Sequence, residues 1–201
     1  GAGGIGQKFP GSCADFPPNL EDKYFENVFL HNDTIVKTHG FCTDVFFKAA
    51  LGWIREKQNA EEPFFAYITP NAPHGPMIAP ESYAKRFSDM GYDKNTAGRY
   101  GMIENIDHNF GVLMDKLDEW GSWENTLVIF TSDNGGITAI SNQYPLRAGK
   151  GSYYEGGIRV PLIFSWQGKI NAGTKSYERV SNIDLKANIP WKYDDTQCLH
   201  A

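Results

Sequence analysis

The sequence lacks two features that would point to common classes of partner. It contains no apolar run of membrane-spanning length, and it lacks the basic excess that nucleic-acid-binding chains carry. Its 201 residues include 19 lysines and arginines against 24 aspartates and glutamates, a formal net charge of -5 at pH 7. We therefore expect no membrane span and no nucleic-acid partner. Cysteine is also scarce, and three cysteines permit at most one internal disulfide, so they do not decide the compartment.

Hydrophobic residues make up 41% of the chain and aromatic residues 14%, which is enough to form the core of one domain. Residues 1–40 are expected to be mostly irregular, because their first half is rich in glycine and proline. Strand-like and helix-like segments alternate over residues 41–185, whereas residues 186–201 lose the apolar repeat. This alternation predicts an α/β fold with helices on the faces of a sheet.

The spacing of apolar residues predicts the individual elements of this core. Apolar runs at residues 64–69 and 127–130 predict strands, the second of them buried on both faces. His108 lies beside the apolar stripe of a predicted helix, which favours a structural or solvent-facing position. The helical spacing predicts helices over residues 43–58, 80–87 and 97–119.

The predicted strand at residues 127–130 runs into the sequence Thr-Ser-Asp-Asn-Gly-Gly, which contains Asp133 and Asn134. Ligands of open α/β sheets lie beyond the carboxyl ends of the strands, so these side chains are placed where a site is expected. A carboxylate and an amide carbonyl offer two hard oxygens, which suit Ca²⁺ or Mg²⁺ better than a thiophilic metal. Two ligands alone do not hold an ion, and further oxygens are required.

Lys150 lies between two glycines in the sequence Gly-Lys-Gly-Ser-Tyr-Tyr-Glu-Gly-Gly-Ile-Arg-Val-Pro. Glycines let the backbone approach a ligand closely, and the lysine ammonium acts as a compact positive charge for an anionic group. The surrounding segment also carries Arg147 and Arg159 against only Glu155, a local basic excess. We therefore expect the substrate to present an anionic oxygen here.

His74 lies in the loop Pro-Asn-Ala-Pro-His-Gly-Pro, which directly follows the predicted strand at residues 64–69. Its imidazole could donate to the same anion or protonate a leaving oxygen. Taken singly, each feature has a plainer explanation: a turn at Asp133, a solvated loop lysine at Lys150, and a packing role for His74. Their joint placement after apolar runs and in a glycine-rich loop favours a site.

Together these motifs resemble the formylglycine-dependent sulfatases, a branch of the alkaline phosphatase superfamily, over about residues 40–185. The resemblance implies an alkaline phosphatase/sulfatase-like α/β fold, with a largely parallel or mixed central sheet and helices on both faces. It also implies that Asp133 and Asn134 are metal ligands, usually for Ca²⁺ and less so for Mg²⁺. His74 and Lys150 match the residues that hold the sulfate and act in catalysis.

The chain departs from the family at the nucleophile. In the family the formylglycine is made from a Cys or Ser that opens a Cys-x-Pro-Ser-Arg-like motif. None of Cys13, Cys42 and Cys198 opens such a motif. We therefore expect no nucleophile in this chain and a formylglycine in a missing N-terminal segment, particularly as the chain begins at Gly1 rather than Met. Residues 1–201 are then one incomplete catalytic domain, inactive in isolation.

The resemblance implies that the complete enzyme hydrolyses sulfate monoesters, with aryl sulfates and sulfated carbohydrates equally open as substrates. It also implies a periplasmic, secreted or lysosome-like compartment. A phosphatase or phosphodiesterase of the same superfamily is one alternative, although its common metal motif pairs Asp with His where this chain has Asn134. A non-catalytic anion- or glycan-binding protein is another alternative, because the nucleophile is missing.

Overall fold

The computed structural model describes residues 24–26, 28–32 and 34–188. The prediction for the tail at residues 186–201 therefore lies almost wholly outside the described residues. The elements are strands β1 Val28–His31, β2 Thr34–Lys37, β3 Val128–Thr131 and β4 Leu162–Ser165, and helices α1 Cys42–Asn59, α2 Glu81–Asp89, α3 Lys94–Glu119, η2 Trp123–Asn125, α4 Glu155–Ile158 and α5 Asn182–Asn188.

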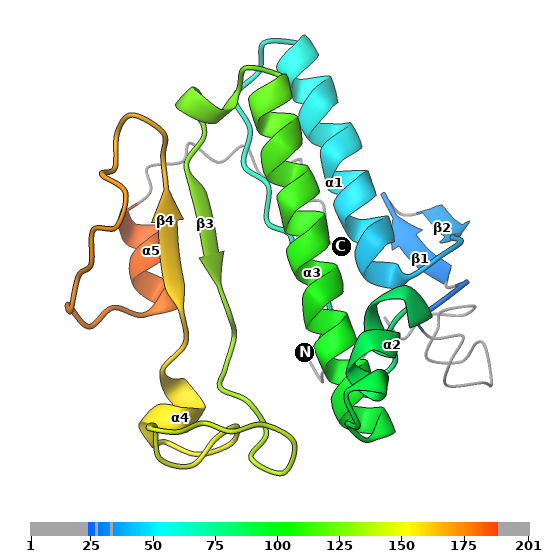
Figure 1. Cartoon of the computed structure of the whole chain (residues 1–201). Helices are drawn as coiled ribbons and strands as arrows, with labels where there is room; N and C mark the ends of the chain where they lie inside the picture. The colour runs from blue at the N-terminus through cyan, green and yellow to red at the C-terminus, as the bar shows by residue number, and fades with distance from the viewer. Residues whose placement is uncertain (1–23, 27, 33, 189–201) are drawn as a thin grey trace.

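The three longest helices form one packed unit, and Figure 1 shows α1 and α3 side by side with α2 crossing the start of α3. α3 begins at a true cap, since the side chain of Asp93 accepts hydrogen bonds from the backbone of Asn95 and Thr96. Gly101 of α3 lets α2 approach closely, because a Cβ there would lie 2.9 Å from the Cα of Ala84. The predicted helices at residues 43–58, 80–87 and 97–119 are all found, with ends shifted by up to three residues.

The core consists of two clusters of buried side chains along α1 and α3. The first surrounds the start of α1 and contains Tyr24, Phe41, Cys42, Ala72 and Met102. The second lies along the other halves of both helices and contains Phe47, Ile54, Leu113 and Leu117. Helix α3 contributes to both clusters, so it connects the two ends of the core. None of the helices in the described part is both long and apolar enough to cross a membrane.

The described strands form two separate antiparallel pairs, β1 with β2 and β3 with β4. The α/β class predicted from the sequence is correct, but a largely parallel or mixed central sheet is not present among the described residues. The pair β1–β2 also lies within residues 1–40, where mostly irregular structure was expected. Each of the two described sheets has only two strands, and these run antiparallel. A parallel or mixed sheet requires parallel neighbours, which neither sheet contains.

The two predicted strands have different outcomes. Residues 64–69 are extended but belong to neither sheet. Their side chains alternate, with Phe64, Ala66 and Ile68 packed on the second core cluster and Tyr67 exposed. The strand predicted at residues 127–130 is found as β3, but burial on both faces is wrong, since none of its four residues is fully buried and Phe130, whose ring packs on Phe110 of α3, remains 37% exposed.

Candidate functional site

The loop after β3 presents two oxygen-bearing side chains. Asp133 is exposed, and one of its carboxylate oxygens accepts a hydrogen bond from the backbone N–H of Asn134 at 2.8 Å. The Asn134 side-chain amide donates to the carbonyl of Gly135 at 3.0 Å. The second Asp133 oxygen and the Asn134 side-chain carbonyl make no hydrogen bond to any described residue. Both of these oxygens are therefore left for a ligand.

Backbone hydrogen bonds join this loop to the segment that carries Lys150. The N–H of Gly135 donates to the carbonyl of Gly157 at 2.9 Å, and the N–H of Lys150 donates to the carbonyl of Gly136 at 2.9 Å. The approach depends on glycine, because a Cβ on Gly135 would lie 1.8 Å from the carbonyl oxygen of Gly156. The structure thus brings Asp133, Asn134 and Lys150 onto two segments that are bonded directly to each other. We call this arrangement, formed by residues 135–136 and 149–157, the glycine lock.

Further contacts hold the lock in place. The N–H of Gly156 donates to the carbonyl of Arg147 at 2.9 Å, which closes the loop before Lys150 onto the start of α4. The guanidinium of Arg99, on α3, donates to the carbonyl of Ile140 and so ties the loop to the helical unit. Figure 1 shows the resulting loop and α4 gathered at one end of the β3–β4 pair.

The three cations of this region differ in their surroundings. Arg159 pairs with Glu155 at 3.1 Å, and the guanidinium of Arg147 lies 3.8 Å from the centre of the Tyr154 ring. The ammonium of Lys150 is exposed and makes no hydrogen bond or ion pair with any residue that the structure describes. Of these three cations, Lys150 is therefore the one most available to an anionic ligand.

His74 lies on a different part of the chain, beside the first core cluster. Its Nδ1 is 3.0 Å from the carbonyl oxygen of Gly75, and its own carbonyl accepts a 2.5 Å hydrogen bond from the buried Tyr24 hydroxyl. Burial raises the pKa of Tyr24, so that hydroxyl stays protonated and continues to donate. Within the described part of the chain, no hydrogen bond or ion pair joins His74 to Asp133, Asn134 or Lys150.

A metal ion would find only part of its ligands here. The free oxygens of Asp133 and Asn134 are hard donors, which fit Ca²⁺ or Mg²⁺. Among the described residues, however, no group of three or more His, Cys, Asp or Glu side chains is placed to hold a metal ion. The chemistry of the two side chains therefore fits a hard cation, but among the described residues they would supply only part of its ligands.

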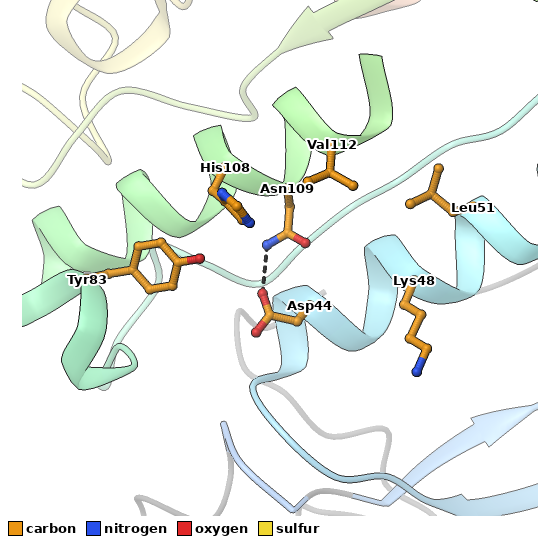
Figure 2. A pocket seen from close by; sticks show the side chains of 7 residues that line it. All are labelled: Asp44, Lys48, Leu51, Tyr83, His108, Asn109 and Val112. Carbon is orange, nitrogen blue, oxygen red and sulfur yellow. Dashed lines mark hydrogen bonds between the residues drawn. The ribbon is translucent and has the colours of Figure 1, made fainter. Parts of the chain in front are cut away.

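A pocket that the sequence did not indicate lies between α1, α2 and α3, with a volume of about 380 Å³, and both polar and apolar side chains line it. Figure 2 shows Asp44 pointing toward Asn109, whose side-chain amide donates to the carboxylate at 2.7 Å. Figure 2 also shows His108 next to Asn109 on α3 and Tyr83 on α2, and the ring centres of His108 and Tyr83 are 5.9 Å apart. The exposed position of His108 agrees with the structural or solvent-facing position expected for it.

A sequence profile of the family described as Sulfatase matches residues 7–189. The chain belongs to the sulfatase family. A sulfatase of Formosa agariphila is 36% identical over 155 residues, which cover 71% of this chain and 28% of the relative. The N-acetylgalactosamine-6-sulfatase of Canis lupus familiaris is 36% identical over 149 residues, which cover 71% of this chain and 27% of that enzyme.

A solved structure gives the fold to which this sulfatase segment belongs. The crystal structure of Ps i-CgsB in complex with k-i-k-neocarrahexaose matches with a TM-score of 0.67 and 36% identity, over 71% of this chain and 32% of that one. The match supports the α/β fold of the alkaline phosphatase superfamily and a formylglycine-dependent family. The chain spans less than a third of the length of these relatives.

Proposed function

We propose that this chain is part of the catalytic domain of a sulfatase that hydrolyses sulfate monoesters. The observation that carries the proposal is the glycine lock, which joins the segment of Asp133 and Asn134 to the segment of Lys150 by two backbone hydrogen bonds. Membership of the sulfatase family supports the same reaction. The complete domain in this proposal has a largely parallel or mixed central sheet, to which this chain contributes one part.

The residues of this chain take distinct roles in the proposed reaction. Lys150 places its ammonium against a sulfate oxygen, where it neutralises charge that grows in the transition state. His74 contacts the ester and protonates the leaving oxygen, so that an alcohol departs. A Ca²⁺ ion, or less favourably Mg²⁺, held partly by Asp133 and Asn134, would supply further positive charge. The formylglycine nucleophile comes from another segment of the protein.

Sulfated carbohydrates and aryl sulfates both stay substrate classes of the proposed reaction, because the relatives include enzymes named for each. One relative is named N-acetylgalactosamine-6-sulfatase, another, of Homo sapiens, is named Arylsulfatase A, and the matching crystal structure is a complex with k-i-k-neocarrahexaose. We extend to this chain only the chemistry that they share, which is a sulfate monoester of a sugar or aryl hydroxyl.

The coding sequence upstream of Gly1 gives the most direct test of the nucleophile. We expect a Cys-x-Pro-Ser-Arg-like motif there, and its absence would favour a non-catalytic anion- or glycan-binding protein. A second assay compares sulfate esters with phosphate esters on the complete protein. Preferential hydrolysis of the sulfate ester supports the proposal, whereas preferential hydrolysis of the phosphate ester would assign the chain to the phosphatase alternative.

A further inference from the structure

The buried hydroxyl of Tyr24 holds the turn that carries His74, although the two residues are 50 positions apart in the sequence. It donates a hydrogen bond to the carbonyl of His74 at 2.5 Å and lies 3.4 Å from the carbonyl oxygen of Gly75. Within the turn, the N–H of His74 donates to the carbonyl of Asn71 at 2.9 Å. The backbone of His74 is therefore fixed both from within its own loop and from the first core cluster.

Tyr24 is in turn fixed by the packing of that cluster. It is 1% exposed, its ring stacks on Phe41 with ring centres 5.8 Å apart, and its carbonyl accepts a hydrogen bond from the N–H of Cys42 at 2.8 Å. Burial raises the pKa of Tyr24, so the hydroxyl stays protonated and remains a donor. A ring packed in this way cannot turn its hydroxyl toward water, so the start of α1 determines where the hydroxyl lies.

The position of the turn determines which nitrogen of the His74 imidazole is left for a ligand. Nδ1 lies 3.0 Å from the carbonyl oxygen of Gly75, and because a carbonyl only accepts, Nδ1 carries the hydrogen in this contact. Nε2 makes no hydrogen bond with any residue that the structure describes. An imidazole held in this way presents Nε2 to a substrate, and in the protonated ring Nε2 can give its proton to an ester oxygen.

We propose that Tyr24 is a positioning residue for His74. Its hydroxyl holds the turn, the Gly75 carbonyl holds the Nδ1–H, and the Nε2–H is thereby directed at the ester oxygen. The inference rests on the proposed function, in which the leaving oxygen takes the electron pair of its bond to sulfur and the Nε2 proton, while the formylglycine oxygen forms the new bond. Tyr24 takes no part in this covalent step. Without its hydroxyl the imidazole can shift, and a displacement of about 1 Å can cost about 10² in rate.

The test compares two sulfate esters on the complete enzyme that contains this chain. The ester 4-nitrophenyl sulfate releases a stable anion that needs no proton, whereas phenyl sulfate releases a more basic phenolate that does. For Tyr24→Phe, which keeps the ring, we expect kcat/KM to fall about tenfold on phenyl sulfate, mainly through kcat, and less than about threefold on 4-nitrophenyl sulfate. His74→Gln should show the same difference between the esters with a larger loss, about 10² or more on phenyl sulfate.

Met102→Leu is the matched control, because Met102 is 0% exposed in the same cluster and its replacement leaves the Tyr24 hydroxyl in place. We expect Met102→Leu and Tyr24→Phe to lower the melting temperature slightly, and Met102→Leu to affect the two esters equally. Equal losses on both esters in Tyr24→Phe, or wild-type kinetics, would overturn the positioning role. Equal losses in His74→Gln would overturn it too, because His74 would then not supply the proton. If the wild type hydrolyses neither these esters nor a sulfated sugar, the proposed function itself fails.

Discussion

At the scale of single residues, Lys150 differs from the two nearby arginines because its positive charge is not paired with another described residue. Arg147 and Arg159 are engaged with Tyr154 and Glu155, whereas the Lys150 ammonium makes no hydrogen bond or ion pair with another described residue. A glycine on each side keeps bulky side chains away from this charge. Lys150 is thus the residue at which the proposed anion site is most directly tested.

Replacing Lys150 should slow the complete enzyme without unfolding it. Lys150→Ala removes a charge that helps most as negative charge grows on the sulfate, so kcat/KM should fall by about 10² to 10³. Lys150→Arg should restore only part of the activity, because the planar guanidinium group of arginine must meet the sulfate in a different geometry from the compact ammonium group of lysine. The measurement is steady-state kinetics on one aryl sulfate.

The melting temperature of each Lys150 variant is the control, and we expect it to stay close to that of the wild type, since the side chain is exposed. A solvated loop lysine would give nearly unchanged kinetics for both substitutions. Wild-type kcat/KM in Lys150→Ala would therefore remove Lys150 from the site.

At the scale of elements, the glycine lock makes a prediction about packing. Gly135→Ala would place a Cβ 1.8 Å from the Gly156 carbonyl oxygen, so the two segments must separate. Displacing catalytic groups by about 1 Å can cost about 10² in rate, and we expect at least this loss of kcat/KM together with a lower melting temperature. Kinetics and thermal unfolding of the complete enzyme check both effects.

Gly111 offers a matched control for this substitution. It lies in α3, and a Cβ there would meet nothing within 4 Å. Gly111→Ala should leave kcat/KM unchanged and stabilise the helix by up to about 1 kcal/mol. If Gly135→Ala behaves like Gly111→Ala, the close approach of the two segments is not required for activity.

Helices α1 and α3 are also joined by a polar contact, which makes a second prediction at this scale. One carboxylate oxygen of Asp44 accepts hydrogen bonds from the side-chain amides of Asn105 and Asn109, each at 2.7 Å. Asn105 is fully buried, so Asp44→Ala would leave its amide without a partner. We expect a loss of about 2 kcal/mol in the free energy of unfolding, measured with urea.

Asp44→Asn keeps an oxygen acceptor and should lose less stability than Asp44→Ala. Asp115→Ala serves as the control, because Asp115 is exposed on α3 and its removal should change stability by less than about 0.5 kcal/mol. Equal effects of Asp44→Ala and Asp115→Ala would show that the buried amides find other partners.

The sequence predicts the helices of this chain better than it predicts the pairing of its strands. Apolar spacing predicts α1, α2 and α3, because a helix satisfies its own backbone and its pattern is local. The run at residues 64–69 predicts a strand, but a strand also needs a neighbour in its ladder, which local pattern does not specify. The pairing of β3 with β4 was likewise not predicted, for the same reason.

In the candidate site, likewise, the residue types can be predicted from the sequence, but the contacts between distant segments cannot. The residue types of Asp133, Asn134 and Lys150 indicated a site, because their chemistry is a property of the side chains. The contact between the Gly135 and Gly157 backbones, which brings these residues together, could not be predicted from spacing alone. The placement of His74 relative to them stays a prediction.

At the scale of the whole molecule, the chain shows apolar surface where a larger domain would continue. The side chains of Ile163 and Phe164 on β4 are 56% and 39% exposed, and Tyr67 is 74% exposed. The chain covers only 28% of the length of the Formosa relative. We expect other parts of the complete domain to cover these side chains and to supply the remaining ligands of the metal.

This expectation leads to a prediction about metal affinity. Ca²⁺ takes about six to eight oxygen ligands, and its affinity depends on the number of charged ligands and the rigidity of the site. Asp133 and Asn134 supply two side-chain oxygens that remain free of hydrogen bonds to described residues. The 201-residue chain should therefore bind Ca²⁺ with a Kd of about 1 mM or weaker, whereas the complete enzyme should bind it well.

Calorimetry on the chain and on the complete enzyme compares the two affinities directly. Asp133→Ala in the complete enzyme should weaken binding strongly, because it removes a charged ligand, while Asp115→Ala should have no effect. Tight binding by the chain alone would contradict the prediction and point to carboxylates such as Asp107 or Glu155. Glu155 is already paired with Arg159 at 3.1 Å, and Asp107 is exposed on α3, so neither is placed as a ready ligand. If the chain and the complete enzyme bound Ca²⁺ with equal affinity, the loop after β3 would therefore have to rearrange around the ion.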